Sequence, residues 1–494
     1  MKMTKITAMV LTAALLGAVA SGCGTPAGSE AYSEDGTATD PVELIYYTIG
    51  TPDADLQLVT DELNKILARK IGVTLQYRKI DWSDYGVKLS ALINSGANFD
   101  IAFASEPDQG DYAGNAVKGV WLDLTDYMTH TEGKVMYNMI DPLFWEGVKI
   151  NGRIYGVHTN KEIAVPEWWM YPAELVEKYD IAVEDYTTLE SLEPLLAMIR
   201  KDEPEWQLME LDKNSNNFFA LNGYEYIISK QIPLMVNSSD PDMEVVSIFE
   251  TDLARQTLQT LRRYYKAGYI NEDAALRESR NLERNAQVFW KQAGGGPYSD
   301  VSWSFDRGYR LVAQRVSEST VTTESARGGV MAVNARTQHP KECVQFLNLL
   351  NTDPEVRNII NYGIEGVHYT LSKNNQVTKI SDLYTGIQYT QGNWFILNTM
   401  AGNPLDTWDK YREFNRSAVK SEILGFTADT SGITGEISSI TQVWSKYYSG
   451  LMTGTLDPDV QLPKFIAELK SAGIDEVKDE LQAQLKDWKA VVKK

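Results

Sequence analysis

The sequence has few of the residues that build metal clusters or disulfide frameworks: among 494 residues there are four His and two Cys. Zinc sites and disulfide scaffolds need several such side chains close together, so neither class of protein is expected. Positive charge is also scarce, with 47 Lys and Arg against 67 Asp and Glu and a formal net charge of −20. A chain this acidic is not attracted nonspecifically to nucleic acid or to an anionic membrane surface. We expect no metal, no cofactor and no nucleic-acid partner.

Long apolar runs are missing as well, apart from one close to the N-terminus. Residues 6–19 are mostly apolar, Lys2 and Lys5 precede them, and small residues follow as far as Cys23. The run is shorter than the roughly 20 residues that a membrane-spanning helix needs. A basic start, a short apolar stretch and small residues at a cleavage point predict an export signal over residues 1–22.

Cys23 stands where a bacterial lipobox has its acylated cysteine, although Ala20 replaces the Leu usually found three positions before it. We therefore predict a palmitate-type lipid anchor at Cys23; the alternative is an ordinary secreted protein with a chance Cys. Residues 23–40 contain almost no large aliphatic side chain, which predicts a flexible tether. Cys343 is then left without a partner, and its apolar helical surroundings predict burial.

Strand and helix patterns alternate directly after the tether. Residues 42–49, 73–80 and 99–104 read as strands, and helical spacing of apolar residues separates them at 56–71 and 83–95. This order predicts parallel strands joined by right-handed crossovers. In such an open sheet, ligands collect outside the carboxyl ends of the strands. The residues at those ends are Thr51, Asp81, Trp82 and Glu106.

The remaining chain divides at a few clear signals. Asn151-Gly152 predicts a hairpin turn, beside which the chain leaves the first lobe, and helices are expected to dominate from about residue 162 to 321. A strand at 329–333 and a helix that begins with Pro340 indicate that the chain returns to the first lobe. We predict one lobe from 41–160 plus about 326–375. The second lobe, with a C-terminal domain ending in a helix after Gly473, takes 161–325 plus about 376–494.

Several short segments, in this order and spacing, resemble the extracellular solute-binding proteins of bacterial ABC importers, in particular the large lipoproteins of the family-one class. The segments are residues 61–65, 80–82, 151–156, 346–354, 362–369 and 424–430 through Ile474. The resemblance implies an α/β fold of the two-lobed periplasmic-binding-protein type (type II), with a hinged cleft and an additional C-terminal helical segment. Neither Val157-His158, where relatives often have a Pro, nor the unusual lipobox alters that expectation.

The resemblance also implies a function: a lipid-anchored receptor on the outer face of the cell membrane that captures a solute and delivers it to an ABC permease. An oligosaccharide is favoured over a peptide, which makes sugar transport the expected role, with a monomer and no enzymatic activity. Two alternatives remain. One is a secreted carbohydrate-active enzyme, which needs two carboxyl groups held about 5 to 10 Å apart. The other is a surface interaction or sensor protein of the same fold.

Aromatic and acidic side chains are the candidate ligand contacts, because a sugar offers flat C–H faces for stacking and hydroxyls for hydrogen bonds. The alternative for each aromatic residue is packing in the core, and for each acid a surface or helix-capping role. The candidates beyond Thr51 are Asp81, Trp82, Glu106, Trp168, Trp169, Tyr171, Trp290, Trp303, Glu365 and Trp394.

The acidic chain argues against strongly acidic sugars as the solute. Without residues 1–22 the formal net charge is −22, and bulk repulsion slows the encounter with an anion. A local basic pocket from Arg78, Arg153 or Lys161 would override this effect.

Overall fold

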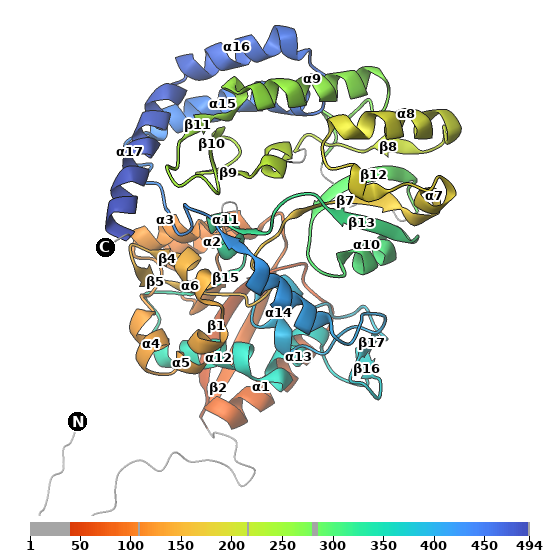
Figure 1. Cartoon of the computed structure of the whole chain (residues 1–494). Coiled ribbons are helices and arrows are strands. Elements are labelled where there is room, and N and C mark those ends of the chain that lie inside the picture. The colour runs from red at the N-terminus through yellow and green to blue at the C-terminus, as the bar shows by residue number, and fades with distance from the viewer. Residues whose placement is uncertain (1–39, 107–108, 215–216, 279–284, 493–494) are drawn as a thin grey trace, which may run out of the picture.

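The computed structural model describes residues 40–106, 109–214, 217–278 and 285–492. The expected export signal, Cys23 and nearly all of the tether lie outside these residues. Two halves of the chain, each containing its own sheet, lie one above the other, and a group of long helices follows the outside of the upper half (Figure 1). Within the described residues, no helix is both long and apolar enough to cross a bilayer.

The first sheet has five strands in the order β2-β1-β3-β15-β6. β1 (Val42–Ile49) pairs in parallel with β2 (Val73–Ile80) and with β3 (Ile101–Phe103), as the sequence predicted. β15 (Val330–Val333) is the strand of the returning chain and runs antiparallel to β3, and β6 (Gly156–His158) completes the sheet. The carboxyl ends of β1, β2 and β3 therefore lie at one edge.

Helices cover this sheet and carry the expected capping residues. α1 (Leu56–Ile71) ends at Gly72, whose φ of 65° is a left-handed conformation that favours glycine. α12 (Pro340–Thr352) begins with its Pro in the first turn and buries Cys343 completely, which confirms the predicted burial. The other helices around this core are α2 (Tyr85–Ser95), α3 (Tyr112–Val117), α4 (Thr125–His130), α5 (Lys134–Met139), α6 (Pro142–Val148) and α13 (Pro354–Tyr362). The hairpin between β4 (Lys149–Ile150) and β5 (Arg153–Ile154) turns at Asn151-Gly152, both with positive φ.

The second half contains more strand than the sequence predicted. A four-stranded sheet has the order β13-β7-β12-β8, and a three-stranded antiparallel sheet has the order β11-β10-β9. Helices still cover more of the described residues between 162 and 321 than strands do, as expected. The strands were not predicted, because they are short and interrupted by turns, which weakens their periodic pattern. The bounds are β7 (Glu167–Pro172), β8 (Gln207–Met209), β9 (Tyr224–Tyr226), β10 (Leu234–Asn237), β11 (Val246–Ser247), β12 (Val288–Gly294) and β13 (Leu311–Arg315).

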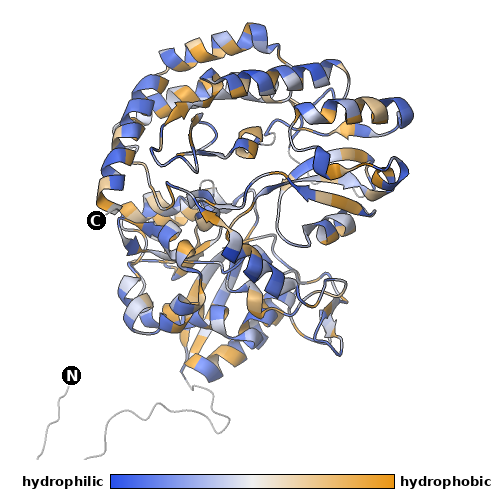
Figure 2. Ribbon diagram, viewed as in Figure 1, coloured by the Kyte–Doolittle hydropathy of each residue, from blue (hydrophilic) through white to orange (hydrophobic). Residues whose placement is uncertain are grey.

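The C-terminal helices extend the core of the second half. α15 (Thr434–Met452), α16 (Pro458–Ser471) and α17 (Ile474–Val492) pack on one another, and α9 (Asp252–Lys266) lies against α15 and α16. Both apolar and polar residues lie along these helices in Figure 2. The start of the last helix directly after Gly473 confirms the sequence prediction. The shorter helices of this half are α7 (Ala173–Lys178), α8 (Glu193–Asp202) and α10 (Ser299–Arg307).

Two separate hydrophobic cores correspond to the two halves. The first core is built by buried residues from 44–164 and 321–360, with Tyr384 and Leu424. The second is built by buried residues from 169–290 and 423–485. Since each core is closed within its own half, the two halves are connected chiefly by the chain segments that pass between them.

The chain crosses between the cores three times. The first crossing joins β6 to β7, and the second follows β13 and contains β14 (Thr320–Val321). The third follows α14 (Thr407–Ser417) and contains β18 (Val419–Lys420), which pairs in parallel with β14. The third crossing comes later in the chain than the expected boundary near residue 375, because the segment before it is packed on the first core. Two short strands in that segment, β16 (Tyr369–Leu371) and β17 (Val377–Lys379), form a small hairpin.

Candidate functional site

Two exposed aromatic rings lie together where β2 ends. Trp82 is stacked on Tyr389, with ring centroids 6.0 Å apart and an interplanar angle of 27°. Their exposed fractions of 37% and 48% are large for such apolar side chains. Exposing this surface to water costs free energy, so a stacked pair left open is typical of a surface that binds a ligand. We call Trp82 and Tyr389 the aromatic platform.

Polar groups lie next to the aromatic platform. The Thr51 hydroxyl, after β1, donates a hydrogen bond of 3.0 Å to Asp81 Oδ2, after β2. The backbone N–H and the hydroxyl of Ser83 donate to Asp81 Oδ1 at 3.2 and 3.1 Å. These hydrogen bonds, that of the Ser83 backbone first, hold the pKa of Asp81 below its usual value. An ionised, oriented acceptor therefore lies beside the aromatic rings, which is the combination that a sugar requires.

Tyr389 reaches this place because its segment is fixed to the first core. Gln391 is buried and lies between two tyrosines: its Oε1 accepts from Tyr46 and its Nε2 donates to Tyr77, both at 2.9 Å. The indole N–H of Trp394 donates to the carbonyl oxygen of Gln388 at 2.7 Å. These bonds hold the backbone on both sides of Tyr389, so the ring is presented by a fixed support.

Arg357 gives the same segment a further anchor. It is fully buried on α13, and its Nη2 donates to the Gln388 carbonyl oxygen at 2.8 Å. Burial lowers the pKa of Arg357 to about 10. Gly50 allows the same segment to pack closely on the end of β1. A Cβ at this position would lie 2.2 Å from Ile387 Cδ1 and would collide with it. Sequence analysis missed Tyr389; the available signal was a lone aromatic residue within the polar, non-periodic stretch of residues 385–393.

Glu106 lies at the carboxyl end of β3, as predicted, but both of its oxygens are engaged by the protein. Oε1 accepts from the backbone N–H of Ala113 at 2.6 Å, and Oε2 accepts from Arg327 Nη1 at 3.0 Å. Arg327 is 1% exposed and also donates to Thr427 Oγ1 at 2.9 Å, near the third crossing. This geometry supports a structural role for Glu106.

Three of the candidate aromatics are fully buried in the second core: Trp169, Tyr171 and Trp290. Trp169 and Trp290 meet edge to face with centroids 5.5 Å apart, and Trp169 Nε1 donates to Gln292 Oε1 at 3.1 Å. In this conformation they expose no surface to a solute. They pack in the core, which was the alternative interpretation for each aromatic candidate. The alternation of side chains along a strand, which places Trp169 and Tyr171 on one face of β7, was a signal for this.

The remaining aromatic candidates gather near the end of β12. The indole N–H of Trp168 donates to the carbonyl oxygen of Gly295 at 3.0 Å, and a Cβ on Gly295 would lie 2.6 Å from the ring of Trp303. Both indoles are partly exposed. Trp394 is 8% exposed and packs on Trp408 and Tyr411. The lack of a Cβ at Gly295 therefore allows the ring of Trp303 to approach the backbone closely.

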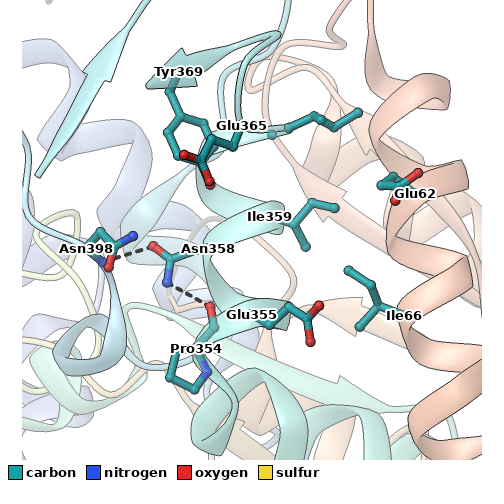
Figure 3. Close-up of a pocket in the computed structure, with 11 residues that line it drawn as sticks. Glu62, Ile66, Pro354, Glu355, Asn358, Ile359, Glu365, Tyr369 and Asn398 are labelled. Atoms are coloured by element: carbon teal, nitrogen blue, oxygen red, sulfur yellow. Dashed lines mark hydrogen bonds between the residues drawn. The ribbon is translucent and has the colours of Figure 1, made fainter. Parts of the chain in front are cut away.

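Glu365 belongs to a different place in the fold. It lines a groove of about 410 Å³ between α1 and α13, together with Glu62, Glu355 and Tyr369. Figure 3 shows these side chains around the groove, on the two helices, on the turn after α13 and on β16. The groove shares no residue with the aromatic platform, so the structure does not bring Glu365 together with Asp81 and Trp82.

None of the three cations named above forms a basic pocket at the platform. Arg78 Nη1 donates to Tyr47 at 2.8 Å, and Arg153 pairs with Asp123 across 2.5 Å. Lys161 is buried and lies 3.3 Å from Glu162. Each of these charges is therefore engaged by a neighbouring side chain.

Comparisons with known proteins agree with this architecture. The family model "Domain of unknown function (DUF3502)" matches residues 414–490, which hold the third crossing and the C-terminal helices. A carbohydrate ABC transporter substrate-binding protein of Streptococcus pneumoniae is 28% identical over 483 residues, covering 96% of each chain.

A solved structure extends the likeness to three dimensions. The N-glycan transport solute binding protein NgtS from Streptococcus pneumoniae has a TM-score of 0.82 at 27% identity, covering 90% of this chain and 98% of NgtS. Its complexes with Man1GlcNAc and Man5GlcNAc have lower TM-scores, 0.75 and 0.72, at 27% and 28% identity and 90% coverage of this chain. The two matches cover 99% and 98% of the NgtS chains in these complexes. The expected two-lobed α/β fold with a C-terminal helical segment is confirmed.

Proposed function

The resemblance to the solute-binding proteins of bacterial ABC importers is confirmed along nearly the whole chain, and we propose that this protein captures an oligosaccharide for such an importer. The solute binds between the two cores and is delivered to a membrane permease. The relatives compared here are substrate-binding transport proteins, so the sugar is expected to remain intact.

The observation that carries this proposal is the exposed stack of Trp82 on Tyr389 beside the ionised Asp81. It lies at the carboxyl edge of an α/β sheet, where ligands of this fold class collect. The aromatic rings offer a flat apolar surface for the C–H face of a sugar ring, and Asp81 accepts a hydroxyl hydrogen. Thr51 orients that carboxylate.

We propose that the two hydrophobic cores are two lobes that close on the sugar. Three crossings between separate cores are the connections that a hinge requires. The different TM-scores to the three NgtS structures are what a change in the relative orientation of two lobes would produce, because a rigid-body rotation of lobes alters the similarity of whole chains. The first lobe then includes residues 377–397, and the second begins again after the third crossing. Ligand stabilises the closed form by its higher affinity for that form.

Lipid attachment at Cys23 is part of the same proposal. An acylated Cys23 and the following residues would hold a monomer on the outer face of the cell membrane, within reach of the permease. Replacement of Cys23 by Ser should move the protein from the membrane fraction to the medium and abolish incorporation of labelled palmitate. Retention in the membrane fraction would contradict the anchor without affecting the proposed solute binding.

The direct test is calorimetric titration of residues 24–494 with oligosaccharides, including Man1GlcNAc and Man5GlcNAc, and with short peptides as the competing class. Saturable binding of an oligosaccharide, with the sugar recovered intact, supports the proposal. Cleaved sugar would favour the enzyme alternative. Binding of none of the sugars would contradict the proposal.

A further inference from the structure

The segment that leads to the aromatic platform is bound to the loop between β1 and α1. Asp53 Oδ1 in this loop accepts a hydrogen bond of 2.9 Å from the backbone N–H of Thr385. Two residues further along the loop, the backbone N–H of Asp55 donates to the carbonyl oxygen of Leu383 at 3.0 Å. The chain that approaches Tyr389 is therefore fixed to the end of the first strand.

A buried ion pair strengthens this connection. Lys79 is the last residue but one of β2, and its Nζ pairs with Asp53 Oδ2 and donates to the Thr385 carbonyl oxygen at 2.7 Å. The side chains of Lys79 and Asp53 are 1% and 8% exposed. The ammonium group also lies 5.0 Å from the centroid of the Tyr384 ring. Lys79 thus joins the end of β2, the loop after β1 and the segment before the platform at one point.

Burying these two charges is not an economical way to stabilise the fold. Burial lowers the pKa of Lys79, and the hydrogen bond and charge of Asp53 oppose that shift. Replacing a buried ion pair by apolar side chains of similar volume often leaves stability unchanged or raises it. What a buried ion pair with satisfied hydrogen bonds supplies in some proteins is one defined arrangement of the chain. The position of the pair relative to the platform indicates which arrangement it defines here.

The ion pair lies between the two chain segments that carry the platform rings. Trp82 follows Lys79 by three residues, and Tyr389 follows Thr385 by four. The hydrogen bonds to the Gln388 carbonyl oxygen hold the second segment directly before Tyr389. Lys79 and its partners hold the same segment at its beginning. The spacing of the two rings therefore depends on the contacts at Thr385 as well as on those at Gln388.

We propose that Lys79 and Asp53 are positioning residues for solute binding: their buried ion pair fixes the spacing of Trp82 and Tyr389 without contacting the solute. This inference rests on the proposed function, because the spacing of the rings affects a sugar only if the platform binds it. Without the ammonium group, the Thr385 carbonyl oxygen and the Asp53 carboxylate lose a buried donor. The segment of residues 383–391 then becomes less ordered, and the two rings present a less well-defined surface to the sugar.

The test is a double-mutant cycle between Lys79 and Tyr389. Calorimetric titration with Man5GlcNAc and Man1GlcNAc gives the affinity of the wild type, K79M, Y389A and K79M/Y389A. Met has a side chain of similar length but neither the charge nor the hydrogen bonds. K70M is the matched control: Lys70 pairs with Asp353 at 2.7 Å and lies in the last turn of α1, at the opposite end of that helix from Asp53.

We expect K79M to bind the sugar at least fivefold more weakly than the wild type. K79M/Y389A should bind within twofold of Y389A, because Lys79 acts through the position of that ring. K70M should bind like the wild type. Unchanged affinity in K79M would overturn the inference. An equal loss in both backgrounds would also overturn it, because that result indicates a general effect on the fold.

Hydrogen exchange of the backbone amides supplies a second measurement that needs no sugar. Residues 383–391 should exchange at least threefold faster in K79M than in the wild type, and at the wild-type rate in K70M. If K79M does not fold, D53N takes its place in both experiments, because Asn keeps the size of the side chain and removes its charge. Unchanged exchange in the folded variant would overturn the positioning role and leave the proposed function standing. A wild type that binds no oligosaccharide would overturn the proposed function and this inference with it.

Discussion

Glu106 and Arg327 form an ion pair of 3.0 Å at the boundary between the first core and the crossings. The side chain of Arg327 is 2% exposed, and it donates not only to Glu106 but also to the carbonyl oxygen of Gly147 at 2.9 Å. One buried guanidinium therefore joins the end of β3, the end of α6 and the segment after the third crossing.

Replacing Glu106 by Gln should destabilise the protein strongly, because it leaves a buried positive charge without its counter-ion. Breaking a buried ion pair in this way costs about 3 to 5 kcal/mol. Urea denaturation monitored by circular dichroism measures the loss. The exposed pair between Arg310 and Glu177 is the control, and E177Q should change the free energy of unfolding by less than about 1 kcal/mol. If E106Q kept the stability of the wild type but lost sugar binding, Glu106 would contact the ligand, as the sequence predicted, and would not have a structural role.

Removing either ring of the aromatic platform should weaken sugar binding without unfolding the protein. Both rings are partly exposed, so W82A and Y389A should each weaken binding about tenfold, or about 1.4 kcal/mol, while the melting temperature changes little. Calorimetric titration with the best oligosaccharide ligand measures the effect. Trp488 on α17 supplies a matched control, and W488F should leave the affinity unchanged. Wild-type affinity in both platform variants would contradict the assignment of the site.

Trp290 should contribute to stability and not to recognition. It is completely buried and its indole nitrogen has no hydrogen-bond partner in the described structure, so W290F loses packing volume but no hydrogen bond. We expect a loss of about 1 to 3 kcal/mol in the free energy of unfolding, below the cost of truncation to Ala. Sugar affinity should stay within twofold of the wild type. A tenfold loss of affinity in a well-folded W290F would show that this residue reaches the solute in another conformation.

Two carboxyls with little exposure, Glu167 on β7 and Glu225 on β9, predict that stability falls as the pH rises. Glu167 and Glu225 have their pKa raised from 4.5 to about 7, so between these pH values the folded protein binds protons that the unfolded chain has released. The free energy of unfolding therefore decreases from about pH 4.5 to pH 7, through these two groups, and the full cost is present at pH 8. E167Q and E225Q should each raise the melting temperature at pH 8 and change it little at pH 4.5. An equal effect of these substitutions at both pH values would rule out the raised pKa values.

Local patterns were sufficient to predict the N-terminal strands and helices of the first lobe, but not the place where the chain leaves that lobe for the last time. The strands at 42–49 and 73–80 were predicted at their observed bounds, because buried parallel strands flanked by helices have a strong apolar pattern. The last helix and the burial of Cys343 followed from helical periodicity in the same way. The second lobe was harder, because its strands are short and pair with partners distant in sequence, such as β7 with β12 and β13.

The candidate site was only partly predictable for a related reason. Trp82 and Asp81 were found because the end of a strand can be read locally. Tyr389 contacts Trp82 across more than three hundred residues, and no local pattern indicates that contact. The burial of Trp290 likewise depends on its neighbours in the folded chain, whereas strand alternation alone places Trp169 and Tyr171 on one face of β7.

The central claim is that Trp82 and Tyr389 form a carbohydrate-binding platform between two closing lobes. The most direct measurement is calorimetric titration of the wild type and the W82A/Y389A variant with Man5GlcNAc and other oligosaccharides. We predict saturable binding of at least one intact oligosaccharide by the wild type, and at least a tenfold loss of affinity in a variant that remains folded. Equal affinity in the two proteins, or a wild type that binds no sugar, would contradict the account.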